Sequence, residues 1–191
     1  MTLLLADHQK TCSCFATLLS YPQAGLTDAL TTCRALLEGR GKAARTLEPF
    51  RRVLEEEGVG RLEELYTAAF DLQPQCYPYV GYQLFGEGKQ RPLFLIKLQE
   101  CYRQQGYLGG GELPDHVSEV LRFLATAATE RVRNEVIEDA LLPALRNMMP
   151  PEPDALGPYG RVLQALQEFL AAQMTISTAG HGPGLKQEVE L

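Results

Sequence analysis

Leu62-Glu-Glu-Leu65-Tyr66-Thr-Ala-Ala69-Phe70 is the stretch that shows the fold class most plainly. Its apolar residues fall at i, i+3, i+4, i+7 and i+8, the spacing that places side chains on one face of an α-helix. The alternation of apolar and polar residues that is typical of strands has a period of two, and we find no such alternation elsewhere in the sequence. The stretch therefore predicts an amphipathic helix in an all-helical protein.

Helical spacing continues in both directions from this stretch. Helices are predicted over residues 4–19, 27–38, 43–57, 62–70, 91–105, 114–128, 131–149 and 159–170. Pro143 lies inside one of them and should kink or divide it, because proline removes a backbone hydrogen bond. The helix at 91–105 has apolar residues on more than one face, so we expect it to be central and buried. Together these elements predict an all-α, single-domain bundle of seven or eight helices.

The first predicted helix and the loops define the domain organisation. The helix is expected to bury one face, formed by Leu4, Leu5, His8, Cys12, Phe15, Ala16 and Leu19, and to end at Tyr21-Pro22. Residues 73–88 are rich in proline, glycine and tyrosine and predict a loop with at most one short helix. We expect one domain over residues 1–175 with a hinge near 106–116, and a disordered tail over 176–191, which has no apolar period.

Charge and hydropathy limit the kinds of partner and the cellular compartment that we expect for this protein. The 191 residues include 24 acidic and 18 basic side chains, a formal net charge of -6. This balance argues against nucleic acid as a partner, since phosphate binding needs a basic face, and it is compatible with a basic peptide. The sequence has no apolar run near the ~20 residues that span a bilayer, and its N-terminal leucines are too few for a secretion signal. We therefore expect a cytoplasmic protein without stable membrane insertion.

The cysteines and histidines do not predict a metal centre or an active site. The five cysteines are odd in number and include no CxxC pair, which favours reduced thiols in the cytosol. Cys12 and Cys14 would point about 200° apart on a helix, a poor arrangement for chelation. The three histidines form no ligand-spaced pair, and neither an HExxH nor a GxSxG motif is present. We expect no bound metal, no cofactor and no enzymatic activity.

Glu112-Leu-Pro114-Asp115-His116 is the most distinctive stretch. A proline that pre-sets helical φ follows a glycine-rich segment, and acids with a histidine then stand at a predicted helix N-terminus. In one interpretation these residues only cap the helix, since acids there are stabilising. In the other, Asp115 and His116 hydrogen-bond a peptide at a hinge between the two halves of the bundle.

The aromatic loop is open to two interpretations as well. Tyr77, Tyr79, Tyr82 and Phe85 lie within nine residues of one another. They can fold back onto the core, as clustered loop aromatics often do. They can also form a binding surface, because tyrosine gives a large contact area at a low entropy cost.

Several of these elements, taken in order over about residues 10–170, resemble the NarJ branch of the NarJ/TorD/DmsD chaperones. The elements are Leu19-Ser-Tyr21-Pro22, Tyr66-Thr-Ala-Ala-Phe70-Asp71, Tyr79-Val-Gly-Tyr82, Leu95-Ile-Lys97-Leu98 and Glu112-Leu-Pro114-Asp115-His116. The resemblance implies an all-helical protein without catalytic activity. It implies that the protein binds, in the cytoplasm, the N-terminal segment of a molybdoenzyme catalytic subunit. It also implies that the protein holds this subunit open for insertion of the molybdenum cofactor.

The same resemblance brings Tyr21 and Tyr82 near the hinge. The expected peptide-binding residues are therefore Tyr21, Tyr82, Glu112, Pro114, Asp115 and His116. Residues 86–91 and the Cys76-Tyr-Pro-Tyr79 run depart from the pattern usual for this branch, so the implied client is nitrate reductase or a related enzyme of the DMSO reductase family. The alternative function, from another class of protein, is that of a regulatory or small-molecule-binding helical domain.

Overall fold

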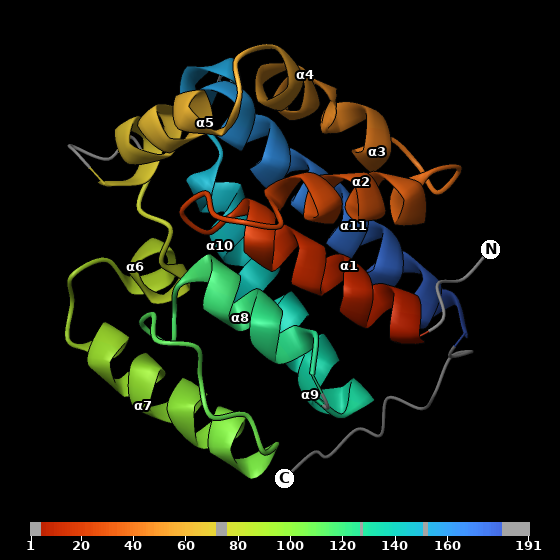
Figure 1. Ribbon diagram of the computed structural model, residues 1–191. Coiled ribbons are helices and arrows are strands. Elements are labelled where there is room, and N and C mark those ends of the chain that lie inside the picture. Colours follow the sequence, from red (N-terminus) through yellow and green to blue (C-terminus); the bar gives the residue numbers. More distant parts are fainter. Residues whose placement is uncertain (1–4, 72–75, 127, 151–152, 181–191) are drawn as a thin grey trace, which may run out of the picture.

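Helices make up every regular element in residues 5–71, 76–126, 128–150 and 153–180, which are the residues that the computed structural model describes (Figure 1). In this part of the chain the one strand-like feature is an isolated antiparallel bridge between Tyr79 and His116. The predicted all-α class is confirmed. None of the helices in the described part is both long and apolar enough to cross a membrane.

The helices follow one another along the chain with short connections. They are α1 (Leu5–Leu18), α2 (Leu26–Leu37), α3 (Ala43–Thr46), α4 (Glu48–Glu56), α5 (Val59–Tyr66), α6 (Val80–Phe85), α7 (Gln90–Gln104), α8 (Val117–Leu124), α9 (Glu130–Glu135), α10 (Leu142–Met148) and α11 (Gly157–Gly180). Two π-helical segments, Thr67–Asp71 and Val136–Leu141, continue α5 and join α9 to α10. A 3₁₀ turn over Pro153–Leu156 leads into α11.

Helix α11 forms the centre of the core, and the stretch at 62–70 packs against its first turns. Tyr159 is fully buried, and its hydroxyl donates to the carbonyl oxygen of Leu62 at 3.1 Å. The rings of Tyr66 and Phe70 meet the Tyr159 ring edge-on, with centroids 5.4 Å away in both pairs. The apolar face predicted from the periodicity is therefore the face that is buried.

Helix α1 lies between α2 and α8 and packs against both (Figure 1). Because it has neighbours on two sides, Cys12 and Cys14 are both buried although they point in different directions. Burial raises the pKa of each thiol, most strongly for Cys12. Leu5 was predicted to lie on the buried face, and this is wrong, since 54% of its surface is exposed in the first turn of the helix.

Proline positions explain where predicted helices are divided. The helix expected over 43–57 is two helices that meet at Leu47, because Pro49 stands in the first turn of α4, where its missing N–H is tolerated. Pro143 divides the predicted 131–149 helix as expected, and it stands in the first turn of α10 after a π-helical segment. The helix expected to start near Pro114 begins at Val117.

Helix α7 lies at the edge of the bundle, so its predicted central position is wrong (Figure 1). Only Leu98 and Tyr102 of this helix are buried, while Leu93 and Ile96 are 61% and 63% exposed. Apolar residues on two faces indicated burial on both, but α11 occupies the central position, and α7 packs chiefly against the short α6.

The last helix is longer than predicted. It continues to Gly180, past residue 176, where the disordered tail was expected to start. The rest of that expected tail, residues 181–191, lies outside the described residues.

Candidate functional site

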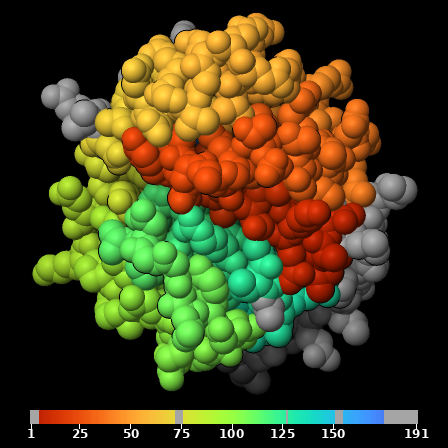
Figure 2. Space-filling model, in the orientation of Figure 1, coloured from red at the N-terminus to blue at the C-terminus, as the bar shows by residue number. Residues whose placement is uncertain are grey.

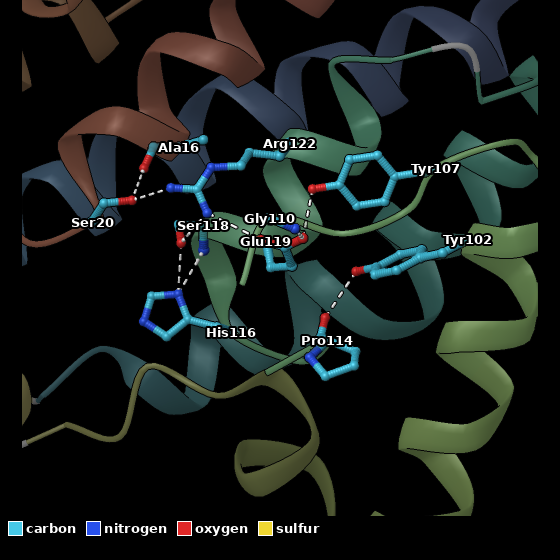
Figure 3. A network of polar contacts seen from close by, with 10 residues as sticks. All are labelled: Ala16, Ser20, Tyr102, Tyr107, Gly110, Pro114, His116, Ser118, Glu119 and Arg122. Carbon is cyan, nitrogen blue, oxygen red and sulfur yellow. Dashed lines mark hydrogen bonds and ion pairs between the residues drawn. The ribbon is translucent and has the colours of Figure 1, made fainter. Parts of the chain in front are cut away.

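The glycine-rich segment 106–116, called here the strap, is held to the bundle by several hydrogen bonds, among them those drawn in Figure 3. The Tyr107 hydroxyl donates to Glu119 Oε1 at 2.6 Å, and the Gly110 amide donates to the same oxygen at 2.5 Å. The Tyr102 hydroxyl donates to the carbonyl oxygen of Pro114 at 2.8 Å. The strap therefore has defined anchors, although its glycines at 106, 109 and 111 adopt positive φ.

Glu119 is the centre of the polar network that holds the strap. Its carboxylate is 1% exposed and accepts from Arg122 Nη1 at 3.0 Å. The other end of the Arg122 guanidinium donates to Ser20 Oγ at 2.7 Å, and Ser20 in turn donates to the carbonyl oxygen of Ala16 at 2.7 Å (Figure 3). Three segments of the chain, the end of α1, the strap and α8, are thus joined through one network around a buried carboxylate.

Asp115 and His116 are buried, at 0% and 3% exposure. The amide of Ser118 donates to His116 Nδ1 at 3.2 Å, so the imidazole is the N-cap of α8. Burial lowers the pKa of His116 to about 4, and the nearby Arg122 guanidinium adds to this effect. Asp115 does not cap the helix: its Oδ2 accepts from Arg91 Nε at 3.1 Å, and its Oδ1 has no hydrogen-bond partner among the described residues.

Backbone hydrogen bonds fix the start of α6 against the start of α8. The amide of Val80 donates to the carbonyl oxygen of Asp115 at 2.7 Å. The amide of Val117 donates to the carbonyl oxygen of Pro78 at 2.8 Å. Gly81 lies against this junction, where a Cβ atom would come within 2.8 Å of Asp115 Oδ2. A glycine is required here because any side chain would displace the carboxylate or its neighbours.

The aromatic loop packs around Arg91, which itself pairs with Asp115. The Arg91 guanidinium carbon lies 5.3 Å from the ring centre of Tyr79 and 5.9 Å from that of Tyr82. Tyr79 also meets the His116 ring edge-on at 5.4 Å, while the rings of Tyr77 and Tyr82 contact each other at a tilt, with centres 4.3 Å apart. The loop thus folds onto the strap-side surface, and Tyr77 remains 40% exposed.

Tyr21 reaches this surface from the end of α1. It is 49% exposed, and its ring meets the Tyr66 ring edge-on at 5.6 Å. Burial raises the pKa of Tyr79, and the carboxylates of Glu112 and Asp71 raise it further, so these acids lie near the tyrosines. Glu112 and Asp71 are exposed and form no ion pair with any residue that the structure describes. The result is a surface of tyrosines and free carboxylates.

Two cavities lie on either side of the strap. One, of about 400 Å³, lies between the strap and α7 and is lined by Gln99, Tyr102, Arg103, Tyr107, Leu108, Gly109, Gly111, Glu112, Pro114 and Glu119. The other, of about 550 Å³, lies towards α1 and shares Tyr107 and Gly109 with the first. Figure 2 shows the yellow-green to green part of the chain forming one continuous side of the surface, next to the red and orange N-terminal helices.

The structure brings the six sequence-predicted residues to one side of the bundle in different ways. Glu112 and Pro114 line the first cavity, whereas Asp115 and His116 lie beneath the surface. Tyr82 is linked to Asp115 through Arg91. Tyr21 packs edge-on against the Tyr66 ring at the end of α5.

Sequence reasoning missed the residues that hold this surface together, above all Arg91 and Glu119. For Glu119 a signal existed, because Arg122 follows it at i+3 on a predicted helix. Among the residues that the structure describes, no group of three or more histidine, cysteine, aspartate or glutamate side chains is placed to hold a metal ion.

Comparisons with known proteins point to one family. A family model described as "nitrate reductase delta subunit" matches residues 34–174. A Bacillus subtilis protein named as a nitrate reductase molybdenum cofactor assembly chaperone, NarJ, is 32% identical over 131 residues, which cover 67% of this chain and 71% of that protein. The crystal structure of an Archaeoglobus fulgidus protein described as a redox enzyme maturation protein has a TM-score of 0.59 and 24% identity, covering 90% of this chain and 96% of that one. This last likeness supports the fold.

Proposed function

The chain belongs to the nitrate reductase delta subunit family, and from that premise we propose that it is a system-specific chaperone for the assembly of a molybdoenzyme. It binds the N-terminal segment of the catalytic subunit in the cytoplasm and assists molybdenum cofactor insertion. The client is nitrate reductase or a related enzyme of the DMSO reductase family. The name of the Bacillus subtilis relative supports the assembly role, and the sequence resemblance supports the peptide as ligand.

The position of the binding site is proposed from one observation. The exposed carboxylate of Glu112 lies on the wall of a cavity of about 400 Å³ and has no ion-pair partner among the described residues. The cavity has the rings of Tyr102 and Tyr107 in its walls, which suit an apolar side chain. A client segment with an apolar anchor and a nearby arginine or lysine would fill the cavity and pair with Glu112 and Asp71. The net charge of -6 favours the approach of such a basic segment.

The six candidate residues divide into two roles under this proposal. Tyr21, Tyr82, Glu112 and Pro114 offer atoms at the surface and contact the peptide. Asp115 and His116 are buried, so they hold the strap and the start of α8 in the shape that the peptide meets.

The proposal includes no catalysis. The contact that most resembles a catalytic pair is the one between Cys12 Sγ and His8 Nδ1, at 3.7 Å. Burial raises the pKa of the thiol and lowers that of the imidazole to about 4, with Arg133 adding to the second shift. A nucleophilic cysteine needs the opposite shifts, since the thiolate is the reactive form. This pair is therefore a packed part of the core rather than an activated nucleophile.

We expect a peptide from the N-terminus of the client's catalytic subunit to bind the purified chain, with Glu112→Gln weakening the affinity about tenfold. The substitution keeps an acceptor oxygen and removes its charge, so a charge-assisted hydrogen bond becomes a neutral one, and a difference of about 1.4 kcal/mol between the two corresponds to about a factor of ten. Calorimetric titration measures this effect, and Glu130→Gln, an exposed acid at the start of α9, is the control that should bind like the wild type. Equal affinity of all three proteins would contradict the site. The absence of any binding by the wild type would contradict the proposed function.

A further inference from the structure

A short part of this acidic chain is strongly basic. Residues 34–52 hold two carboxylates, Glu38 and Glu48, against six cations: Arg34, Arg40, Lys42, Arg45, Arg51 and Arg52. The chain as a whole has a net charge of -6, and these cations lie at the end of α2, in the turn after it, along α3 and at Arg51 and Arg52 of α4, a helix that also holds three glutamates. Figure 1 places these helices on the side of the bundle away from α6 and α7, and thus away from the peptide site.

A pocket of about 480 Å³ opens within this basic region, between the last turn of α2 and the start of α3. Its lining residues are Arg34, Glu38, Gly39, Gly41, Ala44 and Arg45. Its volume lies in the range that small-molecule sites occupy. Two arginines from different helices thus line one open pocket, separated by the turn that contains Gly39 and Gly41.

The guanidinium groups around this pocket have hydrogen-bonding capacity that the described residues do not use. Arg34 Nη2 donates to Glu48 Oε2 at 3.1 Å, but its Nε is buried and has no acceptor. Arg45 is exposed and forms no ion pair with any described residue. An acceptor group of a ligand in the pocket would therefore pair with the Arg45 guanidinium, whose charge no described carboxylate balances, in a charge-assisted hydrogen bond.

We propose that this pocket binds a small molecule that bears a phosphate group. Guanidinium groups match the geometry of phosphate oxygens and bind them through paired hydrogen bonds, and here Arg34 and Arg45 would approach the group from two sides. The carboxylate of Glu38 stands on the same wall, so the rest of the ligand carries hydroxyl or amino groups that can donate to it. The site is separate from the peptide surface and does not depend on the proposed chaperone function.

Calorimetric titration with inorganic pyrophosphate at low salt tests the site. The wild type should bind it saturably at about one site per chain, and Arg45→Gln should weaken binding about tenfold or more. Arg131→Gln is the matched control, an exposed arginine on α9 whose loss should leave the affinity within about twofold. Glu38→Gln should tighten binding severalfold, because it removes a like charge from the wall of the pocket. Thermal melts would show that each variant is folded.

Two outcomes would overturn the proposal. One is the absence of saturable binding by the folded wild type. The other is an equal loss of affinity in Arg45→Gln and Arg131→Gln, which would mean that pyrophosphate responds only to the overall charge of the surface.

Discussion

Replacing Glu119 by alanine is expected to lower the free energy of unfolding by about 3–5 kcal/mol, the range for breaking a buried ion pair by removing one partner. The substitution leaves the Arg122 guanidinium without its carboxylate at 3.0 Å, and it leaves the Tyr107 hydroxyl and the Gly110 amide without their acceptor. The strap loses the hydrogen bonds of both Tyr107 and Gly110 to α8 at the same time. Denaturant unfolding measures the stability, and hydrogen exchange of the amides in residues 107–111 should become faster in the folded protein.

A second pair on this molecule provides a matched control. Glu100 and Arg103 form an ion pair at 2.7 Å with the same i,i+3 spacing, but 44% and 74% of their side chains are exposed. Glu100→Ala should therefore change stability far less than Glu119→Ala, because water screens exposed pairs. Glu119→Gln keeps an acceptor for the Tyr107 hydroxyl and should lie between the two alanine variants. Similar losses in the two alanine variants would contradict the role assigned to the buried network.

Lowering the pH from 7.0 to 4.5 is expected to remove about 5 kcal/mol of stability, about half of it through His116. Burial lowers the pKa of His8 and of His116 to about 4 from the ordinary value of 6.5. Between these values the unfolded chain binds protons that the folded chain does not, so stability falls as the pH falls through 6.5 towards 4. At pH 4.5 each histidine accounts for about 2–3 kcal/mol, from 1.36 kcal/mol per pKa unit.

The stability that is lost above pH 4.5 comes from the histidines, whereas the stability contributed by the acids is lost at lower pH. The pKa of Glu48 and that of Glu100 are lowered by hydrogen bonds from arginines, so the stability from these acids is lost only below their ordinary value of 4.5. His116→Asn keeps a good N-cap for α8 and removes the titrating group, so it should lose about half as much stability as the wild type over the same interval. Urea unfolding at a series of pH values measures this difference. An unchanged pH dependence in His116→Asn would show that this imidazole is not the group responsible.

The helices that bury a single face in the core could be predicted, because their apolar residues recur at regular helical spacing. The stretch at 62–70 and the apolar residues of α11 show this, since both pack one face into the same core. The position of α7 could not be predicted in this way. Leu93 and Ile96 extend its apolar pattern to a second face, and spacing does not show whether that face meets the core or the surface.

The candidate site was partly predictable for a similar reason. Local sequence favoured the acids of this stretch as a cap, whereas the side chain that caps α8 is that of His116 and Asp115 does not cap the helix. The partner of Asp115 is Arg91, which is 24 residues away and belongs to another helix, so no local pattern could pair them. Tyr21 and Tyr82 came from the family resemblance rather than from spacing, and the structure joins Tyr82 to Asp115 through Arg91, whereas Tyr21 packs against Tyr66.

Affinity purification of the tagged chain from its native host, followed by mass spectrometry of its partners, tests whether the chain assembles a molybdoenzyme. We expect the catalytic molybdopterin subunit of a DMSO-reductase-family enzyme to co-purify with the wild-type chain, and to be lost when the first residues of that subunit are deleted. Glu130→Gln should retain the same partner. Recovery of the chain without any molybdoenzyme subunit, under conditions in which the host makes that enzyme, would contradict the proposed function.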